Sequence, residues 1–269
     1  MIDIERLSES VPDGDGYIGQ DGLLHCKKCG GALETIITVP MIGKRKVRCI
    51  CECVSKKLKE REEEKRQAEN ERNRRICFNG SKLMNCTFNN SVQTEHLEMA
   101  KNYVKHFEEF KKQGKGLILH GTVGTGKSHI AACIANALID KGQKVLMTNF
   151  ATMVNTLQST FDGRQEYIDS LNRYALLIID DLGTERRSEY MQEQVFNIID
   201  SRYRSGLPMI ITTNLTGDEI TKTDDIGNSR IYDRILEKCQ PIKVSGQSIR
   251  RKKLKVEYGQ TEMILKGEV

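Results

Sequence analysis

The segment from Gly121 to Ser128 reads GTVGTGKS and matches the phosphate-binding pattern G-x-x-x-x-G-K-[ST] at every fixed position. Glycines let such a loop turn its backbone N–H groups into one concavity, where they can hold nucleotide phosphates. Lys127 would reach the β- and γ-phosphates, and Ser128 would hold Mg²⁺. We therefore expect this loop to bind ATP. The residues expected to contact the nucleotide are Gly121, Thr122, Val123, Gly124, Thr125, Gly126, Lys127, Ser128 and His129.

Two neighbouring acids provide the second half of a nucleotide-hydrolysing site. The apolar run 176–179 has the composition of a buried strand and ends in Asp180 and Asp181, 53 positions after Lys127. An isolated acidic pair often only begins a loop or caps a helix. The separation from Lys127 leaves room for a helix, a strand and another helix, so we expect the pair to face the phosphate loop. Asp180 would anchor Mg²⁺, and Asp181 would orient water as the general base.

A third strand-like run, 208–211, leads into Thr212, Thr213 and Asn214. Parallel strands deliver their carboxyl ends to the same edge of a sheet, so Asn214 would lie near the γ-phosphate or the attacking water. The alternative is a turn in which asparagine only tolerates unusual backbone angles.

Apolar runs and amphipathic segments alternate through the larger part of the chain, which predicts an α/β fold. We expect a three-layer structure, with a parallel sheet covered by helices on both faces. The expected helices are 95–112, 127–140, 150–172 (in pieces), 189–204 and 228–238, and the expected strands are 117–120, 144–148, 175–179, 208–212 and 241–244. The absence of an apolar run of about 18 residues argues against a membrane-spanning helix.

The motifs GTVGTGKS, LLIIDDLG and IITTNL, in this order, resemble those of AAA+ P-loop ATPases. The resemblance covers roughly residues 85–255. Within this class it is closest in kind to bacterial and phage replicative-helicase loaders of the DnaC and DnaI type, with the IstB-type transposition helpers as near relatives.

The resemblance also implies roles for two arginines. Arg234 corresponds to an arginine finger that completes the ATP site of a neighbouring subunit, with Arg230 as the second candidate; a surface ion pair with Asp233 or Glu237 is the alternative. Arg250 corresponds to a γ-phosphate contact within the same subunit, or else belongs to a basic tail. Only 25 residues follow position 244, which implies a reduced lid.

Five of the nine cysteines lie within 28 residues near the start of the chain. They are Cys26, Cys29, Cys49, Cys51 and Cys53. Four thiolates make a tetrahedral structural Zn²⁺ site, and a segment of this size is too short for a sufficient apolar core. The first residues do not resemble a signal peptide, so we expect a reducing cytoplasm and metal rather than disulfides. Spacing leaves open which two of the last three cysteines bind, and whether His25 takes part.

Residues 56–76 are charged, with Leu58 and Ala68 as their only clearly apolar members before the end. Acids and bases spaced three and four apart predict a solvated helical connector. We therefore expect a zinc module at 1–55, a linker at 56–76 and an AAA+ ATPase domain at 77–269.

These features predict a Mg²⁺-dependent ATPase that binds a hexameric replicative DNA helicase and helps place it on single-stranded DNA. The helicase contact would be made by the zinc module, since DnaI-type loaders carry one. Two other classes stay open, an IstB-type helper that acts on target DNA and an adaptor that binds ATP without hydrolysis. The net charge of +5 favours nucleic acid only mildly. Segments 149–169 and 250–255 are candidates for DNA contact. In the first segment Phe150 and Phe161 are candidates for stacking on bases, although we expect both to be buried in the core. Phe88 is a candidate for packing near the adenine.

Overall fold

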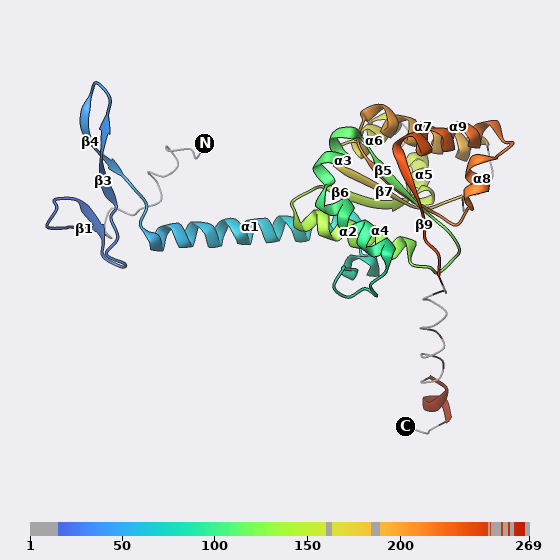
Figure 1. Ribbon diagram of the computed structural model, residues 1–269, viewed down its shortest axis with the longest axis horizontal. Coiled ribbons are helices and arrows are strands. Elements are labelled where there is room, and N and C mark those ends of the chain that lie inside the picture. The colour runs from blue at the N-terminus through green and yellow to red at the C-terminus, as the bar shows by residue number, and fades with distance from the viewer. Residues whose placement is uncertain are drawn as a thin grey trace. The chain divides into compact units, whose positions relative to one another are not determined.

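The computed structural model describes residues 16–159, 163–183, 189–246, 248, 254, 258 and 261–266. The chain forms two compact units, Met1–Glu69 and Asn70–Val269 (Figure 1). Each unit is described by itself below. Among the described residues, no helix combines the length and the apolar character needed to cross a bilayer.

The N-terminal unit is built from two antiparallel hairpins followed by a helix. β1 (Gly16–Ile18) pairs with β2 (Leu24–Cys26), and β3 (Glu34–Val39) pairs with β4 (Gly43–Arg48). Its buried cluster contains only Cys26, Leu33 and Cys51 within the described part of the unit. So small an apolar core cannot offset the conformational entropy lost on folding, and the unit needs another source of stability.

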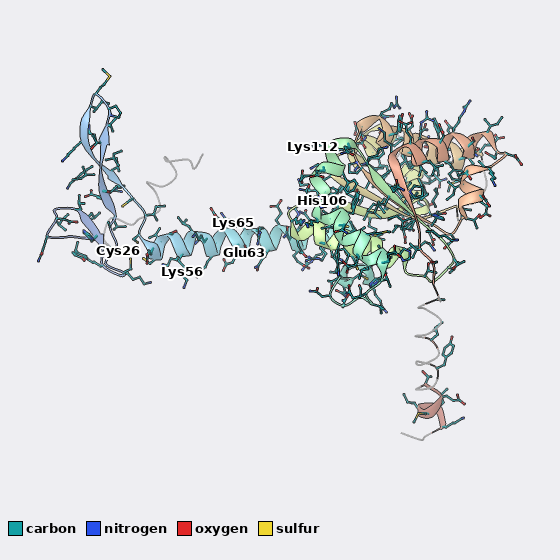
Figure 2. All side chains as sticks on the ribbon, viewed as in Figure 1. Cys26, Lys56, Glu63, Lys65, His106 and Lys112 are labelled. Carbon is teal, nitrogen blue, oxygen red and sulfur yellow. The ribbon has the colours of Figure 1, made fainter. Side chains whose placement is uncertain are left out.

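Helix α1 (Glu52–Phe78) begins in the N-terminal unit and ends in the second. Its first part is solvated, as its charged composition predicts, and Glu63 pairs with Arg66 on its surface (Figure 2). The helix continues beyond the connector expected at 56–76 and ends at Phe78. Cys77 and Phe78 are buried, because these two apolar residues join the core of the second unit.

The second unit contains a five-stranded parallel sheet in the order β6-β7-β8-β5-β9. Its strands are β5 (Gly116–His120), β6 (Val145–Asn149), β7 (Leu176–Leu182), β8 (Met209–Thr213) and β9 (Cys239–Lys243). Its helical elements are η2 (Lys82–Asn85), α2 (Glu95–Lys105), α3 (Phe107–Gln113), α4 (Lys127–Asp140), α5 (Phe150–Ser159), α6 (Arg164–Leu171), α7 (Glu189–Ser205), α8 (Gly217–Thr221) and α9 (Ile226–Lys238).

Side chains alternate between the two faces of this sheet and divide the core in two. Leu117 and Leu119 of β5 pack with α2 and α4, whereas Ile118 packs with α5, α7 and α9. Figure 1 shows the sheet with its surrounding helices. β7 shows the same alternation. The predicted three-layer α/β fold is therefore confirmed.

Two local differences from the sequence prediction have clear causes. The single helix expected over 95–112 is two helices, because the backbone leaves helical geometry at His106. The short helix α8 was not predicted, although Thr216 and Glu219 form a capping box at its start.

Arg202 of α7 is buried at the amino end of the sheet, with 1% of its surface exposed. Its guanidinium donates to the carbonyl oxygens of Pro208, Leu171, Tyr174 and Ala175 at 2.7–3.4 Å. Burial lowers the pKa of Arg202 to about 10. The side chain therefore supplies hydrogen-bond donors to carbonyls that precede β7 and β8, and the Pro208 carbonyl also accepts from the backbone N–H of Leu177 at 3.5 Å.

Candidate functional site

The phosphate loop lies between β5 and α4, and its glycines adopt backbone angles that other residues avoid. Gly121, Gly124 and Gly126 have φ of 140°, 85° and 101°. A Cβ at Gly124 would lie 2.2 Å from Oγ of Ser248, so a side chain has no room there. The loop therefore keeps the glycine pattern for the two reasons expected, positive φ and close approach of other chain segments.

Lys127 begins α4 and is 5% exposed. Its ammonium donates to the carbonyl oxygens of Gly121 and Thr122 and to Oδ1 of Asn214, each at 2.8 Å. Asn214 in turn donates through Nδ2 to Oδ1 of Asp181, at 2.9 Å. One continuous chain of hydrogen bonds thus joins residues that lie 87 positions apart. The sequence expectation that these three strand ends converge is met by this geometry.

The two acids occupy a β-bulge within β7, which extends beyond the end expected at position 179. β7 continues to Leu182, and its pairing with β8 shifts between Ile179 and Leu182. Asp181 has φ of 63°, a left-handed conformation that is uncommon outside glycine. A bulge turns side chains out of the regular alternation, so both carboxylates reach the carboxyl edge of the sheet.

Thr212 holds this bulge in place and was not singled out from the sequence. Its hydroxyl donates to Oδ1 of Asp180 at 2.5 Å and accepts from the backbone N–H of Asp181 at 2.9 Å. The side chain is fully buried at the end of β8. The Thr-Thr-Asn run after an apolar strand was the available signal, since a buried hydroxyl needs a partner.

Burial and neighbouring charges shift the pKa values of two basic side chains in this site. Burial lowers the pKa of Lys127, and the nearby carboxylates of Asp181 and Asp180 offset part of that effect. Burial and the ammonium groups of Lys243 and Lys127 also lower the pKa of His120, at the end of β5. A neutral His120 adds no further positive charge, so the ammonium of Lys127 and the loop N–H groups dominate the attraction for an anion.

The segment that precedes α2 contacts the start of α4. Oγ of Ser91 lies 2.6 Å from Nε2 of His129, and Phe88 packs half-buried against the adjoining core. His129 therefore contributes a side-chain contact beside the loop. Ser91, its partner, was not identified from the sequence, because nothing local to residue 91 indicates a neighbour 38 positions away.

Arg234 lies on α9 and pairs with a residue that the sequence did not suggest. Nε donates to Oδ1 of Asp200 at 2.8 Å, and the guanidinium lies 4.6 Å from the ring centre of Phe196. The ion-pair alternatives Asp233 and Glu237 are therefore wrong, and Glu237 instead accepts from Tyr203. Asp200 also pairs with Arg204, so α7 anchors the half-buried Arg234 side chain.

Some predicted residues fall outside this network. Arg250 and Phe161 lie outside the described residues. Phe150 is 1% exposed and belongs to the core, so it does not offer a surface for stacking on bases. Arg230 is exposed on α9, one turn before Arg234.

Four of the five N-terminal cysteines form a cluster. The sulfurs of Cys26, Cys29, Cys51 and Cys53 all lie within 4.8 Å of one another, and Cys26 is labelled in Figure 2. The sulfurs of Cys51 and Cys53 are 3.2 Å apart, and those of Cys26 and Cys53 are 3.6 Å apart. A tetrahedral zinc site with Zn–S bonds of about 2.3 Å places its sulfurs about 3.8 Å apart, so this donor set fits the metal.

Hydrogen bonds prepare one of these thiols for ionisation. The backbone N–H groups of Gly31 and Cys53 lower the pKa of Cys29 to about 6, whereas hydrogen bonds with Cys51 and Cys29 raise that of Cys53 to about 12. A thiolate that receives two backbone N–H bonds is typical of a metal knuckle.

Cys49 and His25 lie outside the cluster. Cys49 directly follows β4, and its Sγ donates to the carbonyl oxygen of Ala32 at 3.3 Å. Nε2 of His25 lies 3.0 Å from the carboxylate of Asp21, and Nδ1 lies 3.1 Å from the carbonyl oxygen of Gly30. Of the alternatives left open by spacing, the structure therefore selects Cys51 and Cys53.

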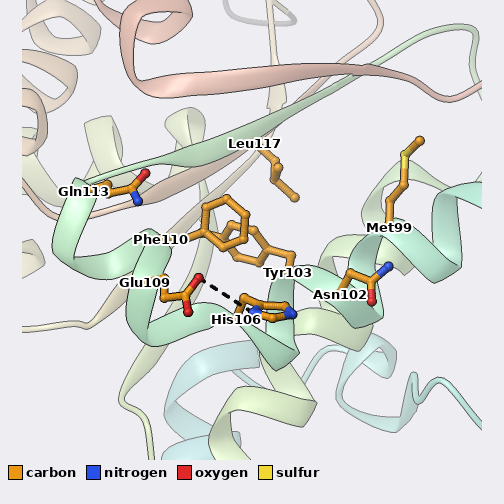
Figure 3. A pocket seen from close by; sticks show the side chains of 8 residues that line it. All are labelled: Met99, Asn102, Tyr103, His106, Glu109, Phe110, Gln113 and Leu117. Carbon is orange, nitrogen blue, oxygen red and sulfur yellow. Dashed lines mark ion pairs between the residues drawn. The ribbon is translucent and has the colours of Figure 1, made fainter.

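A cavity of about 310 Å³ lies between α2, α3 and β5 (Figure 3). The stacked rings of Tyr103 and Phe110 form much of its wall, with centres 4.8 Å apart, and His106 pairs with Glu109 at its rim. No residue of the phosphate loop lines this cavity. It is therefore separate from the nucleotide site.

Comparison with known proteins identifies relatives for the region that holds this site. The family model described as IstB-like ATP binding protein matches residues 53–256. The replicative helicase loader DnaC of Escherichia coli K12 is 32% identical over 160 residues, which cover 56% of this chain and 63% of DnaC. DnaC of Buchnera aphidicola from Schizaphis graminum is 31% identical over 165 residues, 54% of this chain and 65% of its own. The chain thus spans less than two thirds of the length of these relatives.

Solved structures share the fold. A DnaC helicase loader superposes with a TM-score of 0.53 at 22% identity, covering 62% of this chain and all of the other. DnaI superposes with a TM-score of 0.51 at 24% identity, covering 62% of this chain and 91% of the other. The matched family model, the five-stranded parallel sheet and the phosphate loop agree. The chain belongs to the IstB-like family of ATP-binding proteins and is similar in sequence and fold to the DnaC helicase loaders.

Proposed function

We propose that the second unit hydrolyses ATP with Mg²⁺ at the convergence of β5, β7 and β8. The observation that carries this proposal is the hydrogen-bonded series Lys127, Asn214 and Asp181. Lys127 and the loop N–H groups would hold the phosphates, and Ser128 with Asp180 would ligate Mg²⁺, which supplies charge neutralisation at the phosphates. Asp181 would accept the proton of the attacking water.

Asn214 would couple the two halves of this site. Its amide oxygen accepts from Lys127 and its amide nitrogen donates to Asp181, so one side chain contacts both the phosphate-binding and the water-activating residues. A γ-phosphate oxygen would compete for the same Lys127 N–H. Displacement of Asn214 from Lys127 would then free its amide to contact the phosphate or the water.

The proposed biological role is loading of a hexameric replicative DNA helicase onto single-stranded DNA. The named relatives at 31–32% identity are replicative helicase loaders, which supports this role. The four-cysteine cluster, with zinc as its structural metal, supports a separate N-terminal module that binds the helicase. The linker between module and ATPase would be the solvated part of α1.

Arg234 is proposed to act on the ATP site of a neighbouring subunit. Nε donates to Asp200 and Nη1 donates to the carbonyl oxygen of Arg230 at 3.3 Å, so the guanidinium is oriented by its own chain. Nη2 would then contact the phosphate oxygens. A mixing experiment separates this role from a structural one. Arg234→Ala retains its own phosphate loop, and Lys127→Ala retains its arginine, so mixing two inactive variants should restore DNA-stimulated hydrolysis. Mixtures that stay inactive would reject action in trans.

The loader role is tested by size-exclusion chromatography of the full chain with candidate hexameric helicases, with and without ATP. We expect ATP-dependent co-elution with one helicase. The description of the family model favours a second candidate, a transposition helper that acts on target DNA. Binding of double-stranded DNA without any helicase association would select that alternative.

A further inference from the structure

The N-terminal unit exposes more large apolar side chains than its size predicts. Seven of the sixteen such side chains in the described part of the chain belong to it, and four lie on the β3–β4 hairpin, namely Ile36, Ile37, Met41 and Ile42. Isolated exposed apolar residues are ordinary, but a concentration of them marks a surface that contacts another molecule.

The turn of this hairpin holds one of these side chains in a strained backbone conformation. The N–H of Ile42 donates to the carbonyl of Val39 at 3.2 Å, which makes Val39–Ile42 a four-residue turn with Pro40 and Met41 at its centre. Met41 has φ of 68°. A turn with proline second and a positive φ third favours glycine or asparagine at the third position. Methionine is strained there, and its relative exposure of 105% shows that it gains nothing from packing in the described chain.

Positive charge borders this apolar tip. β4 carries Lys44, Arg45, Lys46 and Arg48, and the hairpin has a single acid, Glu34. The antiparallel register places Lys44, Lys46 and Arg48 on one face. Lys46 pairs with Glu34 at 3.7 Å and donates to the carbonyl of Gly22 at 2.7 Å, while the bases nearer the tip are exposed. The tip therefore combines an apolar end with a cationic flank.

We propose that the hairpin tip, Pro40, Met41 and Ile42, docks into an apolar pocket rimmed by carboxylates on a protein partner. This inference rests on the proposed function, which makes the replicative helicase that partner. The phosphate backbone of a nucleic acid would pair with the basic residues of β4, but it would make no favourable contact with an exposed methionine. A lipid surface accepts any apolar side chain and gives no reason for a strained turn, whereas a shaped pocket does.

Substitutions in the tip and in its basic flank should change different rate constants of binding. A kinetic binding measurement on the full chain with the helicase can separate them. The double variant Met41→Asn and Ile42→Ser keeps the turn, because asparagine tolerates positive φ. We expect it to weaken affinity at least about thirtyfold, chiefly through faster dissociation. Lys44→Gln with Arg45→Gln should instead slow association about tenfold and flatten its dependence on salt. Leu265→Ser, an 82% exposed residue of the second unit, is the matched control and should bind like the parent.

The outcomes separate this inference from the proposed function. A parent chain that hydrolyses ATP but binds no helicase overturns the helicase assignment, and the inference with it. A parent that binds, together with a tip variant that binds equally well, overturns the docking inference alone. A tip variant that keeps helicase binding but loses binding to oligo-dT or to anionic phosphatidylserine vesicles shows a different occupant and also overturns it. Unchanged ATP turnover and metal content in every variant exclude unfolding.

Discussion

The two units of this protein differ in how their functional residues depend on an apolar core. In the second unit, two extensive apolar clusters on either face of a sheet hold the phosphate loop and the acids in position. In the N-terminal unit, the described buried cluster contains two of the four clustered cysteines and one leucine. In the second unit, the apolar core positions the phosphate loop and the acids. In the N-terminal unit, the cysteine cluster takes the place of an apolar core.

This difference explains how each unit tolerates strain. The second unit buries Lys127, holds Asp181 in a left-handed conformation and buries Arg202 against backbone carbonyl oxygens. Its large apolar core offsets the free energy that these features cost. The N-terminal unit has no large apolar core in its described part, so we expect its stability to depend on a metal ion held by the four clustered cysteines. The predictions below test this contrast, from the largest effect to the smallest.

Metal removal should unfold the N-terminal unit and leave the ATPase unit intact. Structural zinc sites contribute about 10–16 kcal/mol in small zinc-binding domains, far more than this apolar cluster can supply. Circular dichroism and ATP turnover, measured in excess Mg²⁺ with and without a chelator selective for zinc, check the prediction. Cys51→Ser should have the same effect, and Cys49→Ser, outside the cluster, should keep the metal. Loss of both units together would break the contrast.

Lys127→Ala should lower ATP turnover by about 10²–10³-fold, since it removes a positioned positive charge from the phosphates. Thermal unfolding should stay near that of the parent, because the substitution also removes a buried charge whose pKa is lowered by burial. Lys112→Ala, an exposed lysine of the same unit, serves as the control in both assays. Unchanged turnover would show that the phosphate site is misplaced.

Arg202→Leu should destabilise the ATPase unit by about 3 kcal/mol, because it leaves buried carbonyl oxygens without donors. Urea unfolding of the second unit measures the loss. Arg204→Leu is the matched control, since its pair with Asp200 is solvent-exposed on the arginine side and should contribute less than about 1 kcal/mol. Equal effects of the two substitutions would contradict the role assigned to burial.

The smallest effect concerns His25, whose pKa is raised by hydrogen bonds from its side chain to Asp21 and to the Gly30 carbonyl. A raised folded pKa means that protonated His25 stabilises the unit fully below about pH 6.5, and that this contribution is lost as the pH rises through the folded pKa. Asp21→Asn should therefore move the NMR titration of His25 toward lower pH. An unshifted titration curve would remove Asp21 from this account.

The sequence predicted those parts of the site that depend on contiguous residues. The loop from Gly121 to Ser128 is local, and the ranges of its flanking strand and helix were close to those observed. The meeting of Lys127, Asp181 and Asn214 was also predictable, because parallel strands end at one edge of a sheet.

Other features required the tertiary structure. The bulge at Asp180 and Asp181 depends on pairing with Thr212 of another strand, and the partner of Arg234 comes from a different helix. The alternate spacing of Cys49, Cys51 and Cys53 could not decide among them. These choices are made by contacts between segments far apart along the chain, which no local pattern encodes.

The sequence by itself therefore determined that this chain carries a phosphate loop, a strand-end acid pair and a cysteine knuckle, since each consists of neighbouring residue types. The tertiary structure alone decided which thiols cluster and how the acids are aimed. Cys49 stays at the sheet, with its backbone N–H on the carbonyl of Leu33, while α1 starts between Cys51 and Cys53 and turns both toward the other two. The physical reason is that side-chain direction follows the backbone of each segment, and the side chains of separate segments come together only when those segments pack against one another.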